Sequence, residues 1–264
     1  GYNFKDEPLI RKMNTATHHR GPDATGEWVG DTISLGHNRL AILDLSPRGA
    51  QPMWDAAREV VIVFNGEIYN FRELRSELEK KYSFQSASDT EVMLYAYREW
   101  GIECVKKFNG IFAFALYDTR TEELFLARDH AGVKPLYYFC DGKRLIFSSE
   151  IKGILCHDIP RAVDREAFNL FFNVLYVPEP YTMFEGIKKL PAASYLRLKG
   201  TDATIKKYWE VTDFTNLSSR HEARKEILRL FQDSVQRQLI SDRPVGVFLS
   251  GGIDSTAILG RVAE

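Results

Sequence analysis

The first 150 residues consist of short apolar segments separated by polar breaks, a pattern typical of a β-rich region. Residues 32–38 alternate, with Ile33, Leu35 and His37 on one face, and therefore predict a half-buried strand. Residues 60–64 form a continuous apolar run that contains several β-branched side chains. Such a run predicts a strand that is buried on both faces.

Two further pairs of apolar segments flank short polar turns and predict hairpins. Residues 112–117 and 124–127 form the first pair, and residues 136–139 and 145–147 form the second, around Asp141-Gly142. Short connections of this kind join antiparallel strands. The frequency of such connections argues against a simple doubly wound parallel sheet.

One helix is predicted to begin near Asn70, between the buried strand and the first hairpin. We expect the side chain of Asn70 to cap this helix, with Glu73 closing a capping box. Leu74 and Leu78, four residues apart, then share the face that covers a sheet. A second helix is predicted near residues 90–100.

The second helix has clear boundaries in the sequence. Ser88 or Asp89 can serve as its N-cap, and Gly101 follows its last residue. Helices that cover hairpin-linked strands indicate a mixed α and β domain.

The pattern becomes less regular between residues 158 and 209, where prolines interrupt the apolar segments at 177–180 and 190–193. We interpret this region as edge and connector structure. A long amphipathic helix is predicted over about residues 220–240, and residues 242–244 end it. A second domain is expected to begin with this helix.

A segment near the C-terminal end indicates a strand, a glycine loop and a helix in succession. Residues 245–249 predict the strand, and a helix-capable stretch begins at Thr256. The loop contains Ser250, Gly251, Gly252, Asp254 and Ser255. Glycine backbone N–H groups, hydroxyls and a helix N-terminus together favour a phosphate-binding loop. The loop contains no Lys and does not match the Walker pattern.

The composition of the 264-residue chain is that of an ordinary globular protein, with 44% hydrophobic and 27% charged residues. Its formal net charge of −1 gives no electrostatic reason to expect nucleic acid or an anionic membrane as a partner. Cys104, Cys140 and Cys156 are too widely spaced for a disulfide framework or a zinc site. No signal peptide or membrane-length apolar run is visible, so we expect a cytoplasmic location.

Six motifs in order resemble the class II glutamine amidotransferases. They are His19-Arg20-Gly21-Pro22-Asp23, Gly36-His37-Asn38-Arg39-Leu40, Asn65-Gly66-Glu67-Ile68-Tyr69, Ser88-Asp89-Thr90-Glu91, Arg128-Asp129-His130-Ala131-Gly132 with Lys134-Pro135-Leu136-Tyr137, and Ser148-Ser149-Glu150. The loop at Ser250 resembles the pyrophosphate loop of enzymes that split ATP between its α and β phosphates. Together the motifs resemble the glutamine-dependent asparagine synthetase family.

The resemblance implies a fold and a domain order. Residues 1–195 would form an N-terminal-nucleophile domain, a four-layer αββα sandwich of two antiparallel sheets between helices. Residues 196–218 would be a connector. Residues 219–264 would begin an α/β synthetase domain of the ATP pyrophosphatase type.

The resemblance also implies individual roles. Arg39 would hold the α-carboxylate of glutamine, for which a guanidinium fork is suited. Asp89 would bind the α-ammonium, and Glu67 would lie beside the same pocket. Asn65, through its side-chain amide, and Gly66, through its backbone N–H, would form the oxyanion hole. The histidines at 18, 19 and 130 are interpreted as ordinary polar residues rather than metal ligands.

The ATP site is implied by the same resemblance. The loop residues Ser250, Gly251, Gly252, Asp254 and Ser255 would contact the phosphates of ATP, and Asp254 is a candidate ligand for Mg²⁺.

One departure concerns the nucleophile. Class II glutaminases use an N-terminal Cys whose own α-amine acts as the general base, whereas this sequence starts at Gly1. The family opening Cys-Gly-Ile-x-Gly would align its last glycine with Gly1. Either these residues have been trimmed, or the chain belongs to a branch, like β-lactam synthetase, that lost the cysteine. Retention of Arg39, Asn65 and Asp89 favours trimming.

The expected function is that of the N-terminal portion of a glutamine-hydrolysing asparagine synthetase. Glutamine would supply ammonia, and ATP with Mg²⁺ would adenylate aspartate, giving asparagine, AMP and pyrophosphate. One alternative is a different carboxylate acceptor, such as a sugar acid or a peptide. Another is a glutamine-binding or docking module without catalysis. A homodimer is an open expectation.

Overall fold

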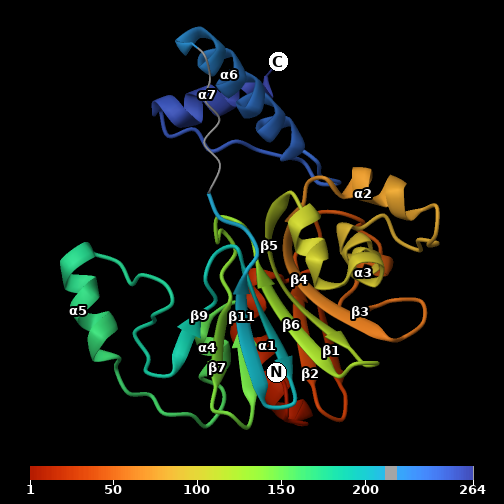
Figure 1. Cartoon of the computed structure of the whole chain (residues 1–264), viewed down its shortest axis with the longest axis vertical. Coiled ribbons are helices and arrows are strands. Elements are labelled where there is room, and N and C mark those ends of the chain that lie inside the picture. The colour runs from red at the N-terminus through yellow and green to blue at the C-terminus, as the bar shows by residue number, and fades with distance from the viewer. Residues whose placement is uncertain (212–218, 264) are drawn as a thin grey trace. The chain divides into compact units, whose positions relative to one another are not determined.

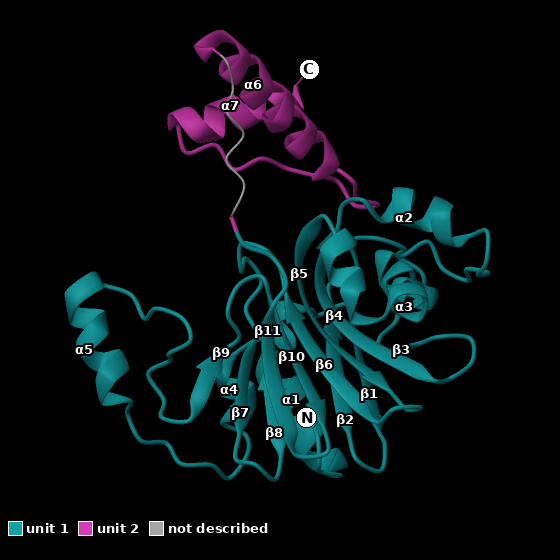
Figure 2. Ribbon diagram, viewed as in Figure 1, with its two compact units in different colours: residues 1–210 teal, residues 211–264 magenta. Residues whose placement is uncertain are grey.

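The computed structural model describes residues 1–211 and 219–263, which form two compact units (Figure 2). Unit 1 contains residues 1–210, and unit 2 contains residues 211–264.

The main sheet of unit 1 has six strands in the order β11-β10-β6-β5-β4-β3, all antiparallel. The strands are β3 (Met53–Trp54), β4 (Val60–Ile68), β5 (Gly110–Asp118), β6 (Glu123–Arg128), β10 (Ser194–Lys199) and β11 (Asp202–Lys207). Their mutual pairing confirms the predicted strand at 60–64 and the predicted 112–127 hairpin.

A second layer faces this sheet and combines two smaller sheets. They are formed by β1 (Ala24–Val29) with β2 (Ser34–Arg39), and by β8 (Leu145–Ser148), β7 (Tyr137–Cys140) and β9 (Ile187–Lys189). Tyr2 forms antiparallel bridges to Ile33 on one side and to Leu145 on the other. The start of the chain therefore joins the two smaller sheets into one layer.

Helices cover the outer face of each layer (Figure 1). The helices α1 (Glu7–Thr17) and α4 (Ile151–Ile154) pack on the second layer, whereas α3 (Asp89–Trp100) packs on β4, with α2 (Phe71–Leu78) beside it. The helix α5 (Arg165–Val174) buries only Ala167 and exposes Phe168 and Phe172. The expected sandwich of two antiparallel layers between helices is confirmed.

The core explains why these layers stay together. Ile33 and Leu35 of the second layer belong to the same buried cluster as Val61, Leu124 and Leu126 of the main sheet. Each of these side chains is fully shielded, and burial of one such side chain contributes about 1.5–3 kcal/mol. The alternation predicted at 32–38 therefore places its apolar face between the two sheets.

The predicted capping box at α2 is wrong. The Asn70 side chain makes no capping bond to the helix; instead its Oδ1 accepts from Asn109 N at 2.8 Å, and its Nδ2 donates to Lys107 O at 2.9 Å. Asn70 therefore anchors α2 to the loop before β5. A long-range pair of hydrogen bonds has replaced the local cap.

The expected connector over residues 196–218 also differs from the structure. Residues 196–199 lie in β10 and pair with β6, and residues 202–207 form β11. The first domain therefore extends to residue 210 rather than ending at 195. Part of the expected connector, residues 212–218, lies outside the described residues.

Unit 2 contains α6 (Arg220–Arg237) and α7 (Ile253–Val262). The helix predicted at 220–240 is confirmed in α6, whose N-cap is Ser219. The strand predicted at 245–249 is not formed, and Phe248 is fully exposed. A strand needs a neighbour that accepts and donates backbone hydrogen bonds, and no strand occurs among residues 219–263 of this unit.

Among residues 1–211 and 219–263, no helix combines the length and apolar character needed to cross a membrane.

Candidate functional site

A cavity of about 310 Å³ lies within unit 1, at the lower end of the size range of ligand pockets. Its wall includes the five residues expected from the family resemblance, namely Arg39, Asn65, Gly66, Glu67 and Asp89. They come from three elements, β2, β4 and the start of α3. The fold therefore brings together all the expected residues of the first domain.

The free edge of β4 supplies the cavity with backbone groups. The strand β3 pairs with Val61 and Ile62, and among the described residues no strand pairs with this edge of β4 from there to Ile68. Even-numbered residues of β4 turn their N–H groups to this edge: Phe64 N donates to Gln51 Oε1 at 2.6 Å, and Ile68 N donates to Asp89 Oδ2 at 2.9 Å. By the same alternation, the N–H of Gly66 lies between them on the cavity side.

Gly66 can be only a glycine in this backbone. Its φ angle is +151°, and a Cβ atom at this position would lie 2.1 Å from the carbonyl oxygen of Ile111 on β5. Both the torsion and the contact exclude a side chain. The absence of a side chain at Gly66 therefore allows β4 to lie directly against β5 at this position.

Asn65 contributes a donor that is held away from water. Its Nδ2 atom is buried and has no hydrogen-bond partner among the residues that the structure describes. Leaving a buried amide unpaired costs about 1–3 kcal/mol. Such a cost is tolerated where a ligand supplies the missing acceptor.

Arg39 is nearly fully buried, with 8% of its surface exposed. Its Nη1 donates to Ser46 O at 2.8 Å, and its Nη2 donates to Leu43 O at 3.3 Å and to Asp44 O. These carbonyls fix the plane of the guanidinium without cancelling its charge. No ion pair to a carboxylate is formed by Arg39 within the described part of the chain. The cavity wall therefore carries a positive charge suited to an anion.

Glu67 and Asp89 bring two carboxyl groups to the wall of the same cavity. Burial raises the pKa of Glu67, and the neighbouring Asp89 raises it further, although Lys134 partly opposes both effects. Burial also raises the pKa of Asp89, against hydrogen bonds from the backbone of Ile68 and from Thr90. Two buried carboxylates with raised pKa values are stabilised by a cation between them.

Gln51, His37 and Lys134 also line the cavity but were given no role from the sequence, although His37 and Lys134 lie within the quoted motifs. His37 was placed on the inward face of its strand, yet its alternation with Leu35 indicated only a core position. Gln51 stands in a loop without periodicity, so no local signal marked it. The sequence left open whether Ser88 or Asp89 caps the helix α3. In the structure Ser88 is the N-cap, because its Oγ accepts from Glu91 N. The Asp89 carboxylate is therefore not needed as a cap and can face the cavity.

Short-range hydrogen bonds join the residues of the glycine loop in unit 2. Ser250 Oγ lies 3.0 Å from Ser255 Oγ and accepts from Gly252 N at 3.3 Å, and Gly252 is the N-cap of α7. Gly251 has a φ angle of +81°, which favours glycine. Asp254 lies in the first turn of α7. The five expected loop residues therefore lie together at a helix N-terminus.

Two of the histidines interpreted as ordinary polar residues make contacts within unit 1. His19 Nε2 contacts Glu150 Oε1 at 2.9 Å, and His130 packs against Tyr208 and Trp209. Within the described ranges there is no group of three His, Cys, Asp or Glu side chains that could hold a metal ion.

Comparison with known proteins identifies the two parts of the chain. A family model described as glutamine amidotransferase domain matches residues 1–209, and a model described as asparagine synthase matches residues 226–264. Among solved structures, unit 1 is similar in fold to the glutamine phosphoribosylpyrophosphate amidotransferase from B. subtilis, with a TM-score of 0.58 at 17% identity. That match covers 79% of this chain and 48% of the other.

Curated relatives are more similar in sequence. Asparagine synthetase [glutamine-hydrolyzing] 3 of Bacillus subtilis is 40% identical over 98% of this chain, and asparagine synthetase B [glutamine-hydrolyzing] of Escherichia coli is 36% identical over 94%. The chain spans 43% and 40% of these two relatives, respectively. Because the glutamine amidotransferase domain model matches residues 1–209, the chain belongs to that family.

Proposed function

We propose that unit 1 binds glutamine and hydrolyses its side-chain amide, as the glutaminase part of a glutamine-dependent asparagine synthetase. One observation carries the proposal: a single cavity is lined by Arg39, by the carboxylate pair Glu67 and Asp89, and by the donors of Asn65 and Gly66. A free amino acid has a carboxylate and an ammonium group that match the guanidinium and the carboxylate pair. Its side-chain amide then lies near the two donors.

Different charged residues of the cavity bind the two charged groups of glutamine. Arg39 donates to the α-carboxylate from a guanidinium whose plane is already fixed by backbone carbonyls. The α-ammonium lies against Asp89 and Glu67, where it relieves the repulsion that raises the pKa of Glu67. Binding therefore favours the ionised form of both carboxylates.

The chemical step requires stabilisation of a negative oxygen. When a nucleophile attacks the amide carbon, its oxygen becomes an oxyanion, and Asn65 Nδ2 and the N–H of Gly66 are positioned to donate to it. One such donor contributes roughly 3 kcal/mol to the transition state. Ammonia leaves when the tetrahedral intermediate collapses.

The nucleophile is proposed to be a Cys in a Cys-Gly-Ile-x segment placed ahead of Gly1. Gly1 lines the cavity, and its backbone pairs with Ser34 in both directions, at 2.6 and 2.9 Å. A strand that continues from Gly1 in this register runs along β2 towards Arg39. The α-amine of the Cys would accept the thiol proton and pass it to the amide nitrogen, which leaves as ammonia while the sulfur stays bound to the glutamyl group as a thioester. Water then releases glutamate.

The second half of the proposal concerns ATP. The Ser250 to Ser255 loop offers hydroxyls, backbone N–H groups and a helix N-terminus, which suit the phosphates of ATP. Asp254 supplies one carboxylate for Mg²⁺, an ion that is held by one or two carboxylates together with substrate phosphates. Adenylation of aspartate by ATP would then allow ammonia to displace AMP. The homodimer and the cytoplasmic location stay predictions.

Three forms of the protein test the glutaminase proposal: the chain as given, the chain preceded by Cys-Gly-Ile-x, and the latter with Asn65→Ala. Calorimetry should detect glutamine binding to the chain as given. Glutamate release should occur only after the Cys is added, and Asn65→Ala should lower kcat by about 10² to 10³. Glutamine binding without turnover in every form would instead favour a binding module. Absence of binding would refute the site.

A further inference from the structure

The Phe64 peptide, immediately before Asn65, is held on the free edge of β4 by two side chains. Its N–H donates to Gln51 Oε1 at 2.6 Å, and its carbonyl oxygen lies 3.0 Å from His37 Nε2. In a regular sheet a neighbouring strand would make both bonds, but β3 begins only at Met53 and does not pair with Phe64. Gln51 and His37 therefore replace that strand.

The tautomer of His37 can be inferred from its contact with the Phe64 carbonyl oxygen. A carbonyl oxygen only accepts, so Nε2 must carry the proton. Burial, together with the nearby charge of Arg39, lowers the pKa of His37 to about 4. The ring is therefore neutral near pH 7 and holds the Phe64 carbonyl with a single fixed tautomer.

Gln51 also contacts the helix α3. Its Nε2 donates to Thr90 Oγ1 at 3.3 Å, in the first turn of α3. Thr90 in turn forms hydrogen bonds with the Asp89 carboxylate that counter the burial-raised pKa of that group. One side chain thus links the strand segment before Asn65 to the helix start that carries Asp89.

We infer that Gln51 and His37 are positioning residues that hold Phe64, and through it the Asn65 and Gly66 donors, in the geometry needed for the oxyanion. The inference rests on the proposed glutaminase function and deepens it. Neither residue is required to touch the reacting atoms. A displacement of the donors by about 1 Å is enough to lower turnover by roughly 10²-fold.

Gln51→Met, in the chain preceded by Cys-Gly-Ile-x, tests the inference, because Met has a similar length but neither donates nor accepts strongly. The expected result is a fall in kcat of about 10-fold or more, with a smaller change in KM. The matched control is Gln85→Met, since Gln85 is exposed in the same unit. The control should leave kcat within twofold of the parent.

A second pair of variants separates positioning from packing. His37→Gln can keep a donor near the Nε2 position, whereas His37→Leu removes it. The expected order of kcat is parent, then His37→Gln, then His37→Leu, with at least a tenfold gap between the two variants. Equal losses in both would indicate packing alone and overturn the inference for His37.

A readout independent of turnover is the exchange rate of the Phe64 amide proton, measured by NMR on the chain as given. Gln51→Met should accelerate this exchange at least tenfold while the unfolding temperature changes little. If the parent turns over glutamine but Gln51→Met matches it in kcat and exchange, only this inference fails. If the parent bearing the Cys shows no turnover, the proposed function fails, and the positioning role falls with it.

Discussion

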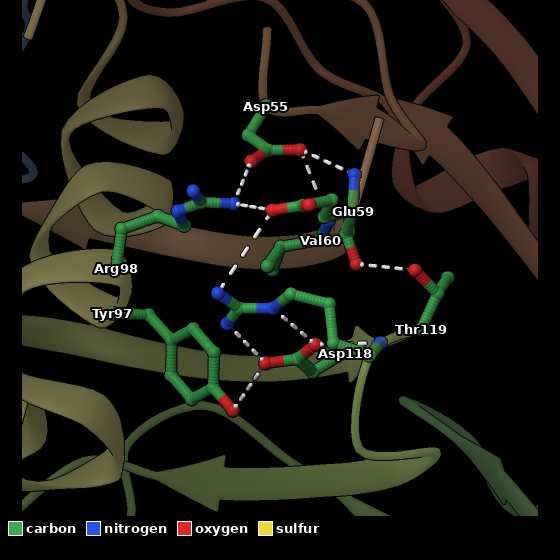
Figure 3. Close-up of polar contacts among 8 residues, drawn as sticks. Asp55, Glu59, Val60, Tyr97, Arg98, Asp118 and Thr119 are labelled. Atoms are coloured by element: carbon green, nitrogen blue, oxygen red, sulfur yellow. Dashed lines mark hydrogen bonds and ion pairs between the residues drawn. The ribbon is translucent and has the colours of Figure 1, made fainter. Parts of the chain in front are cut away.

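Two acidic clusters lie near opposite ends of the strand β4, and each includes residues of the helix α3. The pKa values of Asp118 in one cluster and Glu67 in the other are shifted in opposite directions. At one end, Asp55 and Glu59 contact Arg98, and Asp118 is held by Arg120 and Tyr97 (Figure 3). At the other end, Glu67 and Asp89 face the cavity with Lys134 as the nearest opposing charge. Every carboxylate of the first cluster has a guanidinium partner within the fold, whereas Glu67 and Asp89 form no ion pair among the described residues.

The pKa values express this difference. Burial alone would raise the pKa of Asp118, but hydrogen bonds from Arg120, at 2.9 Å from Nε and 2.5 Å from Nη2, outweigh it and lower that pKa. Glu67 and Asp89 have no such partner, so burial raises the pKa of each. A carboxylate pair that the fold leaves without full neutralisation indicates a site for a cationic ligand.

The largest expected effect is at the cavity pair. Asp89→Asn keeps an oxygen that can accept from Ile68 N but removes the charge that binds the ammonium. Glutamine affinity of the chain should therefore fall by about 10²-fold or more, as expected for loss of one partner of a buried charge pair. Calorimetry measures this change. An affinity within threefold of the parent would contradict the assignment of Asp89.

The matched change in the other cluster should affect stability and leave binding intact. Asp118→Asn weakens the paired bonds from Arg120, so the free energy of unfolding should fall by about 2 kcal/mol. All four Trp residues lie in unit 1, so their fluorescence during urea unfolding reports this unit alone. Glutamine affinity should remain within twofold. A large loss of affinity with unchanged stability would reverse the proposed roles of the two clusters.

The smallest expected effect is a dependence of stability on pH with opposite sign in the two clusters. Because the pKa of Glu67 is raised in the folded state, its proton is bound more tightly there than in the unfolded chain, whose value is about 4.3. The stability of the ligand-free chain therefore falls as pH rises from that value through the folded pKa. Asp118, with its lowered pKa, instead loses stabilisation as pH falls below about 4.

Glu67→Gln should remove the first of these trends. At pH 8 the variant should be more stable than the parent by about 1–2 kcal/mol, and the difference should vanish near pH 4. Urea unfolding across this range, without glutamine, provides the measurement. A variant less stable than the parent at pH 8 would mean that another group already neutralises Glu67.

Several features could be predicted from the sequence because their causes are local. The alternation at 32–38, the apolar run at 60–64 and the turn at Asp141-Gly142 depend on neighbouring residues, and the corresponding strands are present. The five cavity residues of unit 1 were expected from the resemblance of their motifs to a known family, and they line one cavity. Their chemical roles stay predictions.

Other features were decided by contacts between distant parts of the chain. Asn70 exchanged its expected local cap for bonds to residues 107 and 109, and residues 196–207 joined the main sheet because β6 had an open edge. Gln51 lies in a loop without periodicity, so the sequence did not mark it as a cavity residue. Its bond to Phe64 N forms because β3 begins only at Met53 and does not pair with Phe64.

The sequence by itself determined which residues carry charge and where the locally encoded elements lie, such as the buried strand β4 and the helix α3. Only the tertiary structure decided which charges are neutralised, because the partners of Asp118 and Asp89 depend on which side chains the fold brings beside them. Burial changes the free energy of a charge by several kcal/mol, and burial is a property of the packed molecule rather than of any local segment.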